Sequence, residues 1–256
     1  MSTGKKGFLK VLSFLLTAVF ICACGLDTFY YVDSPVSDSH IASYLSDDPV
    51  SNYFSCRTTE ESPSENQYMF GSSECTFLGT EIYYKIYNNA STMISTESTI
   101  GNMASDSGTS SSSASYLIDT KGYKPLKLSS GAVSLLIKAG SSPQNRFVYI
   151  KLTDSEPICV SSSPMQIYVA GNELLVGGNP VYPRRYIDSG KGFSFGLNDD
   201  NPVPLQTDED VTWSDSTTET GVWYVDMYAV SLARDVNYAL QYSRPYLMGS
   251  VSIRTE

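Results

Sequence analysis

Histidine and basic residues are scarce in this sequence. It contains one histidine, His40, and 17 lysines and arginines against 27 acidic residues, which gives a net charge of −10. Nucleic-acid backbones are bound by clusters of lysine and arginine, and beyond Lys10 the chain has one adjacent basic pair, Arg184-Arg185. This balance argues against a nucleic-acid-binding protein.

The single histidine also limits the catalytic chemistry to consider. His40 lies in the turn-rich segment Asp38-Ser39-His40. A serine or cysteine nucleophile needs a basic side chain held beside it, and an isolated histidine in a turn favours an exposed loop residue instead. We predict no catalytic residue and expect the protein not to be an enzyme.

Metal-site spacing is absent as well. None of the five cysteines belongs to a Cys-x-x-Cys or Cys/His pattern, so no zinc site is predicted. Carboxylates cluster at Asp199-Asp200 and at Asp208–Asp210. The turn Asn198–Asn201 could supply oxygen ligands to calcium, but it lacks the spacing of an EF-hand loop. Paired carboxylates could also serve a glycoside hydrolase. The preferred interpretation is solvated turns between strands, with no metal and no cofactor.

No hydrophobic run is long enough to cross a bilayer. Val11–Ile21 is an eleven-residue stretch broken by Ser13 and Thr17, whereas a membrane-spanning helix needs about 20 residues. Its length is typical of the hydrophobic region of a signal peptide. The lysines that precede it are Lys5, Lys6 and Lys10. These features predict an exported protein.

Ile21-Cys22-Ala23-Cys24-Gly25 follows this stretch and resembles the lipobox of bacterial lipoproteins. The resemblance implies that signal peptidase recognises Ile21 and Ala23, removes residues 1–23, and leaves a lipid such as palmitate on Cys24. The lipid would tether the chain to a cell-envelope membrane, and Gly25 favours the outer membrane. The alternative is an ordinary secretory signal with a chance cysteine. We expect a tether over residues 24–50 and a domain over residues 51–256.

Cys56 and Cys75 are the candidates for a disulfide, which an oxidising envelope would permit. They are nineteen residues apart and flank a polar stretch. The alternative is that the cysteines are free and buried as small apolar residues.

The domain has the pattern of antiparallel β-structure. Nineteen tyrosines and ten phenylalanines favour strands, and few segments are long and apolar enough to be crossover helices. One helix is predicted over residues 91–104, followed by a flexible serine-rich loop over 105–115. The segments that alternate between apolar and polar positions are residues 81–87, 146–151, 166–169 and 223–229.

Several of these segments resemble strands of fibronectin type III domains. Gly79–Tyr87 is similar to the third strand of that family and Trp223–Ser231 to the sixth, while 53–58 and 250–253 are similar to the second and last. The resemblance implies an immunoglobulin-like or fibronectin-like β-sandwich with at most one or two short helices. Because 135 residues separate the third-strand and sixth-strand segments, a large insertion is expected at about residues 91–210. Two β-subdomains that share strands, or a jelly roll, are the alternatives.

The alternation places four tyrosines opposite the aliphatic residues of these strands: Tyr83, Tyr87, Tyr224 and Tyr228. If the two strands are neighbours, the rings form one surface suited to binding a protein or a glycan, because tyrosine offers contact area at low entropic cost. The alternative, which the size of the insertion favours, is that the insertion covers this face and makes the tyrosines a second core.

Together these features favour a lipid-anchored, non-catalytic binding or structural module of the cell envelope. The alternative is an envelope enzyme that acts on glycan or peptidoglycan through paired carboxylates.

Replacing Cys24 tests the lipid anchor. We expect Cys24→Ala to abolish incorporation of labelled palmitate and to leave the uncleaved precursor, because the thiol of Cys24 is the group that is acylated. Cys22→Ala is the matched control and is expected to keep both the label and the cleavage. Palmitate labelling followed by gel electrophoresis measures both properties, and a label that persists in Cys24→Ala would contradict the prediction.

Overall fold

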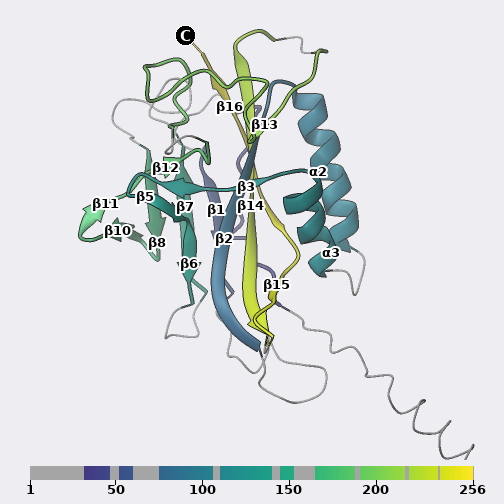
Figure 1. Cartoon of the computed structure of the whole chain (residues 1–256), viewed down its shortest axis with the longest axis vertical. Coiled ribbons are helices and arrows are strands. Elements are labelled where there is room, and N and C mark those ends of the chain that lie inside the picture. Colours follow the sequence, from purple (N-terminus) through teal and green to yellow (C-terminus); the bar gives the residue numbers. More distant parts are fainter. Residues whose placement is uncertain are drawn as a thin grey trace, which may run out of the picture.

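The protein is mostly β-structure, with helices on one face of a long central pair of strands and further strands on the other face (Figure 1). The computed structural model describes residues 32–46, 52–59, 75–105, 110–139, 145–152, 165–187, 191–216, 219–235 and 237–255. In chain order the elements are β1 (Phe54–Arg57), β2 (Cys75–Tyr87), α2 (Ala90–Ser105), α3 (Ser110–Ser115), a π-helical turn (Tyr116–Thr120), β3 (Lys124–Pro125), β4 (Lys127–Leu128), β5 (Gly131–Ser134), β6 (Leu136–Lys138), β7 (Phe147–Lys151), β8 (Gln166–Val169), β9 (Asn172–Glu173), β10 (Leu175–Val176), β11 (Asn179–Pro180), β12 (Pro183–Arg184), β13 (Val211–Thr212), β14 (Val222–Asp235), β15 (Leu240–Tyr242) and β16 (Tyr246–Arg254).

β2 and β14 form the centre of the main sheet. They pair antiparallel along nearly their whole lengths, from Tyr87 opposite Tyr224 to Cys75 opposite Asp235. β16 and β15 pair with β14, whereas β3, β6 and the parallel β13 pair with β2. The prediction that the two tyrosine-rich strands are neighbours in one sheet is therefore confirmed.

A second antiparallel sheet, in the order β1-β7-β8-β9, packs on one face of the central pair. Alternate residues of its strands, such as Phe54, Val148 and Ile167, are buried with Ile82 and Met227 in the largest hydrophobic core. Alternation of apolar and polar residues predicts the strands at 146–151 and 166–169, and the resemblance to fibronectin type III domains implies the strand at 53–58. The expected mostly β, antiparallel and sandwich-like architecture with few helices is confirmed.

The helices lie on the opposite face of the central pair. α2 begins after Asn89, whose Oδ1 accepts a hydrogen bond from the backbone N–H of Thr92 at 2.9 Å, the usual arrangement of an N-cap. Met93 and Ile100 on α2 are buried. The helix predicted over residues 91–104 is confirmed.

The predicted serine-rich loop is wrong over its second half, because Ser110–Ser115 is the helix α3. Ala114 on α3 and Leu117 in the π-helical turn are fully buried in the core beneath the helices. Docking of these two side chains outweighs the weak helix propensity of serine. Residues 106–109 lie outside the described part of the chain.

Residues 32–46, which were expected in the tether, pack against the domain. Val36 forms a β-bridge with Arg57 and Ala42 forms one with Gly249. Val32 and Ala42 are buried. The packed domain therefore includes Val32, and at most the residues before it can serve as a tether. Within the described ranges, no helix combines the length and apolar character needed to span a bilayer.

Gly79 allows β6 to pass close to β2. Its φ is +142°, and a Cβ atom there would lie 2.2 Å from the carbonyl oxygen of Ile137.

We expect Gly79→Ala to lower the free energy of unfolding by about 3 kcal/mol, measured by urea denaturation. Gly101→Ala in α2 is the matched control, since a Cβ there meets nothing within 4 Å, and it should stabilise the protein by up to about 1 kcal/mol. Equal effects of the two substitutions would refute this account of Gly79.

Candidate functional site

The four tyrosines predicted as a binding surface are buried. Tyr83, Tyr87, Tyr224 and Tyr228 are each at most 7% exposed, and they belong to two cores that include residues of α2, α3 and the π-helical turn. The prediction of an exposed tyrosine surface is wrong for this reason. The structure instead shows the alternative, in which the inserted residues cover this face and form a second core with it.

The covered face also contains a buried acid, Asp226, directly opposite Lys85. The hydroxyl of Tyr123 donates a short hydrogen bond to Asp226 Oδ2, and the Tyr87 and Tyr123 hydroxyl oxygens are 2.9 Å apart. Burial raises the pKa of Asp226 well above its usual value, and the charge of Glu97 adds to this effect against the opposing Tyr123 bond. The face is therefore interior, and the acid is not accessible to a substrate.

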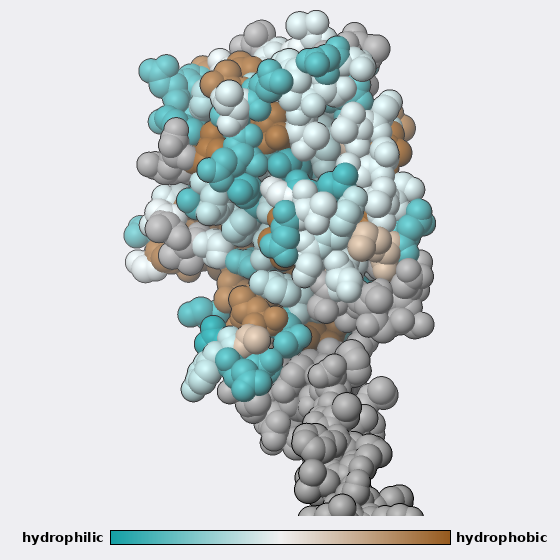
Figure 2. All heavy atoms as spheres, turned by 45° about the vertical axis from the view of Figure 1, so that its right-hand side comes forward, coloured by the Kyte–Doolittle hydropathy of each residue, from teal (hydrophilic) through white to brown (hydrophobic). Residues whose placement is uncertain are grey.

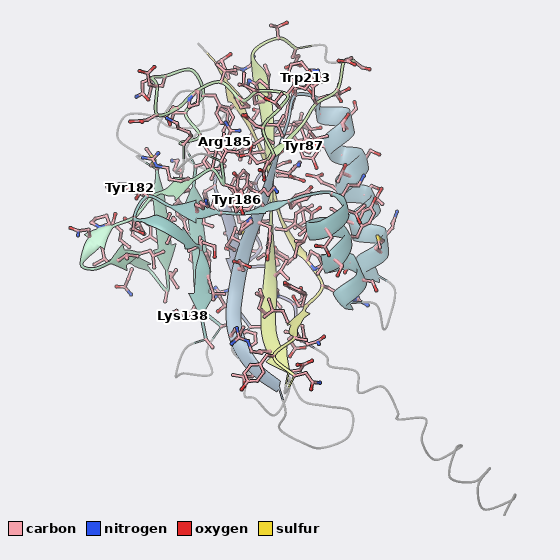
Figure 3. The ribbon with its side chains drawn as sticks, viewed as in Figure 1. Tyr87, Lys138, Tyr182, Arg185, Tyr186 and Trp213 are labelled. Carbon is pink, nitrogen blue, oxygen red and sulfur yellow. The ribbon has the colours of Figure 1, made fainter. Side chains whose placement is uncertain are left out.

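A second buried charge lies at Arg185, one residue of the basic pair Arg184-Arg185. The guanidinium of Arg185 binds Asp210 through two bonds of 2.6 and 2.9 Å and Asp208 through one of 2.8 Å. Tyr84 donates to the same Asp210 carboxylate at 2.6 Å. Figure 3 shows Arg185 between the central pair and the neighbouring strands. Asp208 and Asp210 therefore serve an internal ion pair, which joins the 208–210 turn to the core.

The other acidic turn, Asn198–Asn201, is closed by its own hydrogen bonds. Asn198 Oδ1 accepts from the N–H of Asp200 at 3.0 Å and from the side chain of Asn201 at 2.9 Å. Lys191 Nζ lies 3.9 Å from an Asp200 oxygen. Among the described residues, no group of three or more histidine, cysteine, aspartate or glutamate side chains could hold a metal ion.

Gly192-Phe193-Ser194-Phe195-Gly196 has the Gly-x-Ser-x-Gly letters of a hydrolase nucleophile elbow, a pattern that the sequence-based argument against a catalytic serine overlooked. In an elbow the serine is exposed on a strand-to-helix turn, whereas Ser194 is 1% exposed between the buried Phe193 and Phe195. The only histidine, His40, stacks on Tyr53 with 3.9 Å between ring centroids. The geometry therefore does not support catalysis at Ser194.

Cys56 is a free and fully buried thiol on β1, so the predicted disulfide with Cys75 is not formed in this structure. The side chain packs in the largest core beside aliphatic residues, and burial raises the pKa of the thiol. Ile21, Ala23 and Cys24 lie outside the described residues, and their roles stay predictions.

Exposed apolar side chains gather at the end of the main sheet where β14 begins and β16 ends. We call the set the Trp213 surface; it comprises Leu45, Leu197, Val203, Leu205 and Trp213, which are between 40% and 75% exposed. Leu45, Val203 and Trp213 line pockets there, whereas Leu197 follows Gly196, which lies against Val203, and Leu205 follows Val203 by two residues. Figure 2 shows hydrophobic residues at this upper end of the molecule, and Figure 3 labels Trp213 there.

The Trp213 surface is hollowed by two adjoining pockets. One, of about 310 Å³, is lined by Val203, Trp213 and Trp223, and the other, of about 240 Å³, by Leu45 and Tyr44. Both pockets share Glu219 and Val222, so they flank the start of β14. The pocket at Val203 is mainly apolar, whereas the pocket at Leu45 is more polar. Exposed apolar surface of this kind is typical of interaction sites.

A chain of aromatic rings fixes this surface to the core. Phe195 lies 6.3 Å from Trp223, and Trp223 lies 6.1 Å from Trp213, measured between ring centroids. Trp213 Nε1 donates to Asp215 at 3.1 Å, so its polar group is satisfied while the ring stays partly exposed. A rigid tryptophan in a pocket is the residue type that most often dominates a protein interface.

The charge around the Trp213 surface is mainly negative. Residues 199–219 contain seven acids and no lysine or arginine. Basic side chains from elsewhere in the chain approach some of them: Arg185 binds Asp208 and Asp210, Lys124 binds Glu209, Lys191 lies 3.9 Å from Asp200, and Arg254 lines the pocket at Leu45. A partner complementary to this surface would carry apolar and basic side chains.

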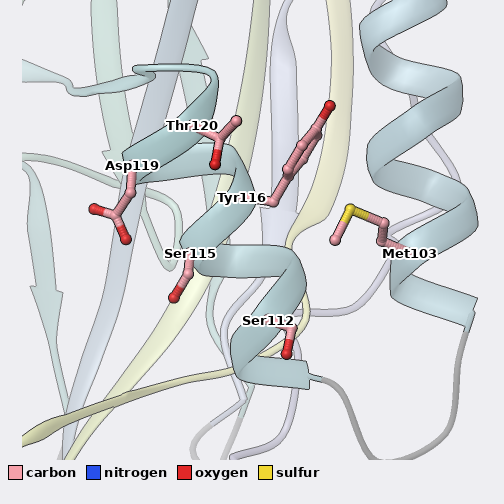
Figure 4. A pocket seen from close by; sticks show the side chains of 6 residues that line it. All are labelled: Met103, Ser112, Ser115, Tyr116, Asp119 and Thr120. Carbon is pink, nitrogen blue, oxygen red and sulfur yellow. The ribbon is translucent and has the colours of Figure 1, made fainter.

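A more polar pocket of about 440 Å³ lies between α2 and the π-helical turn (Figure 4). Its lining includes Met103, Tyr116 and one acid, Asp119. A single carboxylate does not provide the two acids that glycoside hydrolysis requires.

No protein-family model, curated protein or solved structure matches this chain. Its function must be inferred from its own residues.

Asp226 should make the stability of the protein depend on pH. Its folded pKa lies above that of unfolded aspartate, about 3.9, so the folded state binds the extra proton and stability falls as the pH rises from that value toward the folded pKa. Asp226→Asn removes this loss and keeps an acceptor for Tyr123. The free energy of unfolding of Asp226→Asn minus that of the wild type should be larger at about pH 8 than at about pH 4, by more than about 1 kcal/mol.

Denaturant unfolding at several pH values measures this difference. Asp200→Asn is the control for loss of one negative charge at the surface, since the Asp200 side chain is 87% exposed. Profiles of wild type and Asp226→Asn that run parallel would contradict the expected protonation of Asp226.

Proposed function

We propose that this chain is a lipid-anchored lipoprotein of the cell envelope, in the outer membrane, that acts as a non-catalytic binding module. It holds a protein partner on the Trp213 surface. The observation that carries the proposal is the position of this surface relative to the point where the N-terminal segment joins the domain.

The N-terminal segment joins the domain far from the Trp213 surface. Ser34, ten residues after Cys24, donates to the carbonyl of Arg244 at 2.8 Å. The neighbouring Ser243 bonds to Ser231, which lies nine residues along β14 from Val222. Nine residues of strand span about 30 Å. Residues 36–44 then run beside β16 toward the Trp213 surface.

This arrangement suits a module that is held at one end and binds at the other. A lipid on Cys24 would keep the Ser34 side toward the membrane, so the exposed Leu205 and Trp213 would face away from it. The surrounding acids also disfavour contact with an anionic bilayer. A protein partner with basic and apolar side chains fits both properties.

The alternative of an envelope enzyme gains no support from the described acids. Asp208 and Asp210 bind Arg185, and Asp226 is buried beneath the helices. The three pockets lined by Asp119, Glu173 and Glu219 contain one described carboxylate each. Binding is the function that the exposed residues favour.

Site-specific photo-crosslinking in cells tests the proposed function. A photoreactive amino acid at position 205 of the full-length chain is expected to give a discrete adduct with an envelope protein. Adding Trp213→Ala should reduce that adduct about tenfold or more, because the ring forms one wall of the pocket beside Val203.

Position 238 is the matched control, since Tyr238 is 80% exposed beyond the far end of β14. Tyr238→Ala should leave the adduct at position 205 unchanged. The same adducts from positions 205 and 238, or an adduct insensitive to Trp213→Ala, would count against the Trp213 surface as the binding site.

A further inference from the structure

An apolar groove of about 770 Å³ opens between β6 and the strands β8 to β10. This volume lies within the range of pockets that hold small molecules. The groove is separate from the Trp213 surface, since the two share no residue.

The floor of the groove is continuous with the largest hydrophobic core. Leu128, Leu135 and Ile137 line the groove and belong to that core. On the opposite wall, Leu175 and Val176 of β10 are 51% and 40% exposed. A hydrocarbon chain in the groove would cover these two side chains and extend the core outward.

Two cations line the groove on the side of β6. Lys138 ends β6, as Figure 3 shows, and the guanidinium of Arg146 donates to the carbonyl oxygen of Lys138. Among the described residues that line the groove, Glu173 is the one acid, so these residues have a net positive charge although the chain has a net charge of −10. Lysine and arginine together at one place suit the head group of an anion.

We propose that this groove binds one long-chain fatty acid. The hydrocarbon chain lies along Ile137, Leu175 and Val176, and the carboxylate meets Lys138 and Arg146. An acyl chain has no hydrogen-bonding groups and needs no polar partners along an aliphatic wall. A peptide would bring backbone N–H and C=O groups that must be satisfied there.

Binding of palmitate to the mature chain, residues 24–256, tests the proposal. Cys24→Ser in every sample prevents an acyl group of the protein's own from competing. Titration calorimetry is expected to show saturable binding of one palmitate per chain. Leu175→Glu should weaken this binding at least tenfold, because it places a charge beside the hydrocarbon.

Leu205→Glu is the matched control, since it makes the same change at an exposed leucine of the Trp213 surface and should leave palmitate binding unchanged. Lys138→Ala should weaken palmitate binding about three- to tenfold and leave binding of the uncharged hexadecanol unchanged. This contrast separates loss of the head-group contact from a general loss of structure, which equal unfolding curves also check.

Three outcomes would overturn the proposal: no saturable binding of palmitate, unchanged binding by Leu175→Glu, or binding of phosphatidylglycerol vesicles without binding of palmitate. None of them bears on the Trp213 surface, because the experiment uses no envelope partner and no lipid anchor.

Discussion

The pairing of β2 with β14 is the contact on which both cores depend. The two strands are separated by more than 130 residues of sequence, yet they run antiparallel from Tyr87 opposite Tyr224 to Cys75 opposite Asp235. Each strand contributes alternate residues to two faces. A one-residue slip of register would exchange the aliphatic face with the face of tyrosines and buried charges. The correct register therefore decides which residues meet the second sheet and which meet the helices.

The two faces are stabilised by different chemistry. The face toward β1, β7 and β8 is largely aliphatic and aromatic, whereas the face beneath the helices holds Lys85, Asp226 and tyrosine hydroxyls. Lys85 Nζ is satisfied by the carbonyl oxygens of Gly122 and Glu209 at 3.2 and 3.1 Å. Since buried polar groups must be bonded, these contacts fix the positions of the turns at 122 and 209. The turn at 209 also contains Asp208 and Asp210, which bind Arg185.

Periodicity was enough to predict the central strands but not what covers them. The alternation in residues 81–87 and 223–229 identifies two faces, and tyrosine suits either an exposed surface or a core. Burial of Tyr83 and Tyr228 depends on α3, whose serine-rich sequence has weak helix propensity and becomes helical through Ala114 and Leu117. The local pattern places Asp200 in a turn and Asp226 in a strand, but it does not show that helices cover the face of the strand on which Asp226 lies.

The candidate site was harder to predict for a similar reason. The Trp213 surface combines Leu45, residues 197–205 and Trp213, which are distant in sequence, and single exposed leucines are common in all proteins. The run of acids from 199 to 219 was visible, but its place around an apolar surface was not. Gly192–Gly196 shows the opposite case, in which the letters of a motif are present and the fold buries its serine.

The distance in sequence between β2 and β14 also sets the order in which the protein can fold. As the chain is synthesised, β2 appears more than 130 residues before β14, and β16 follows β14 in the sequence. Pairings between such distant segments form slowly, and until then β2 is an apolar, aromatic strand with unpaired edges that favours aggregation. Completion of the main sheet must therefore await synthesis of β14 and of β16, which pairs with it.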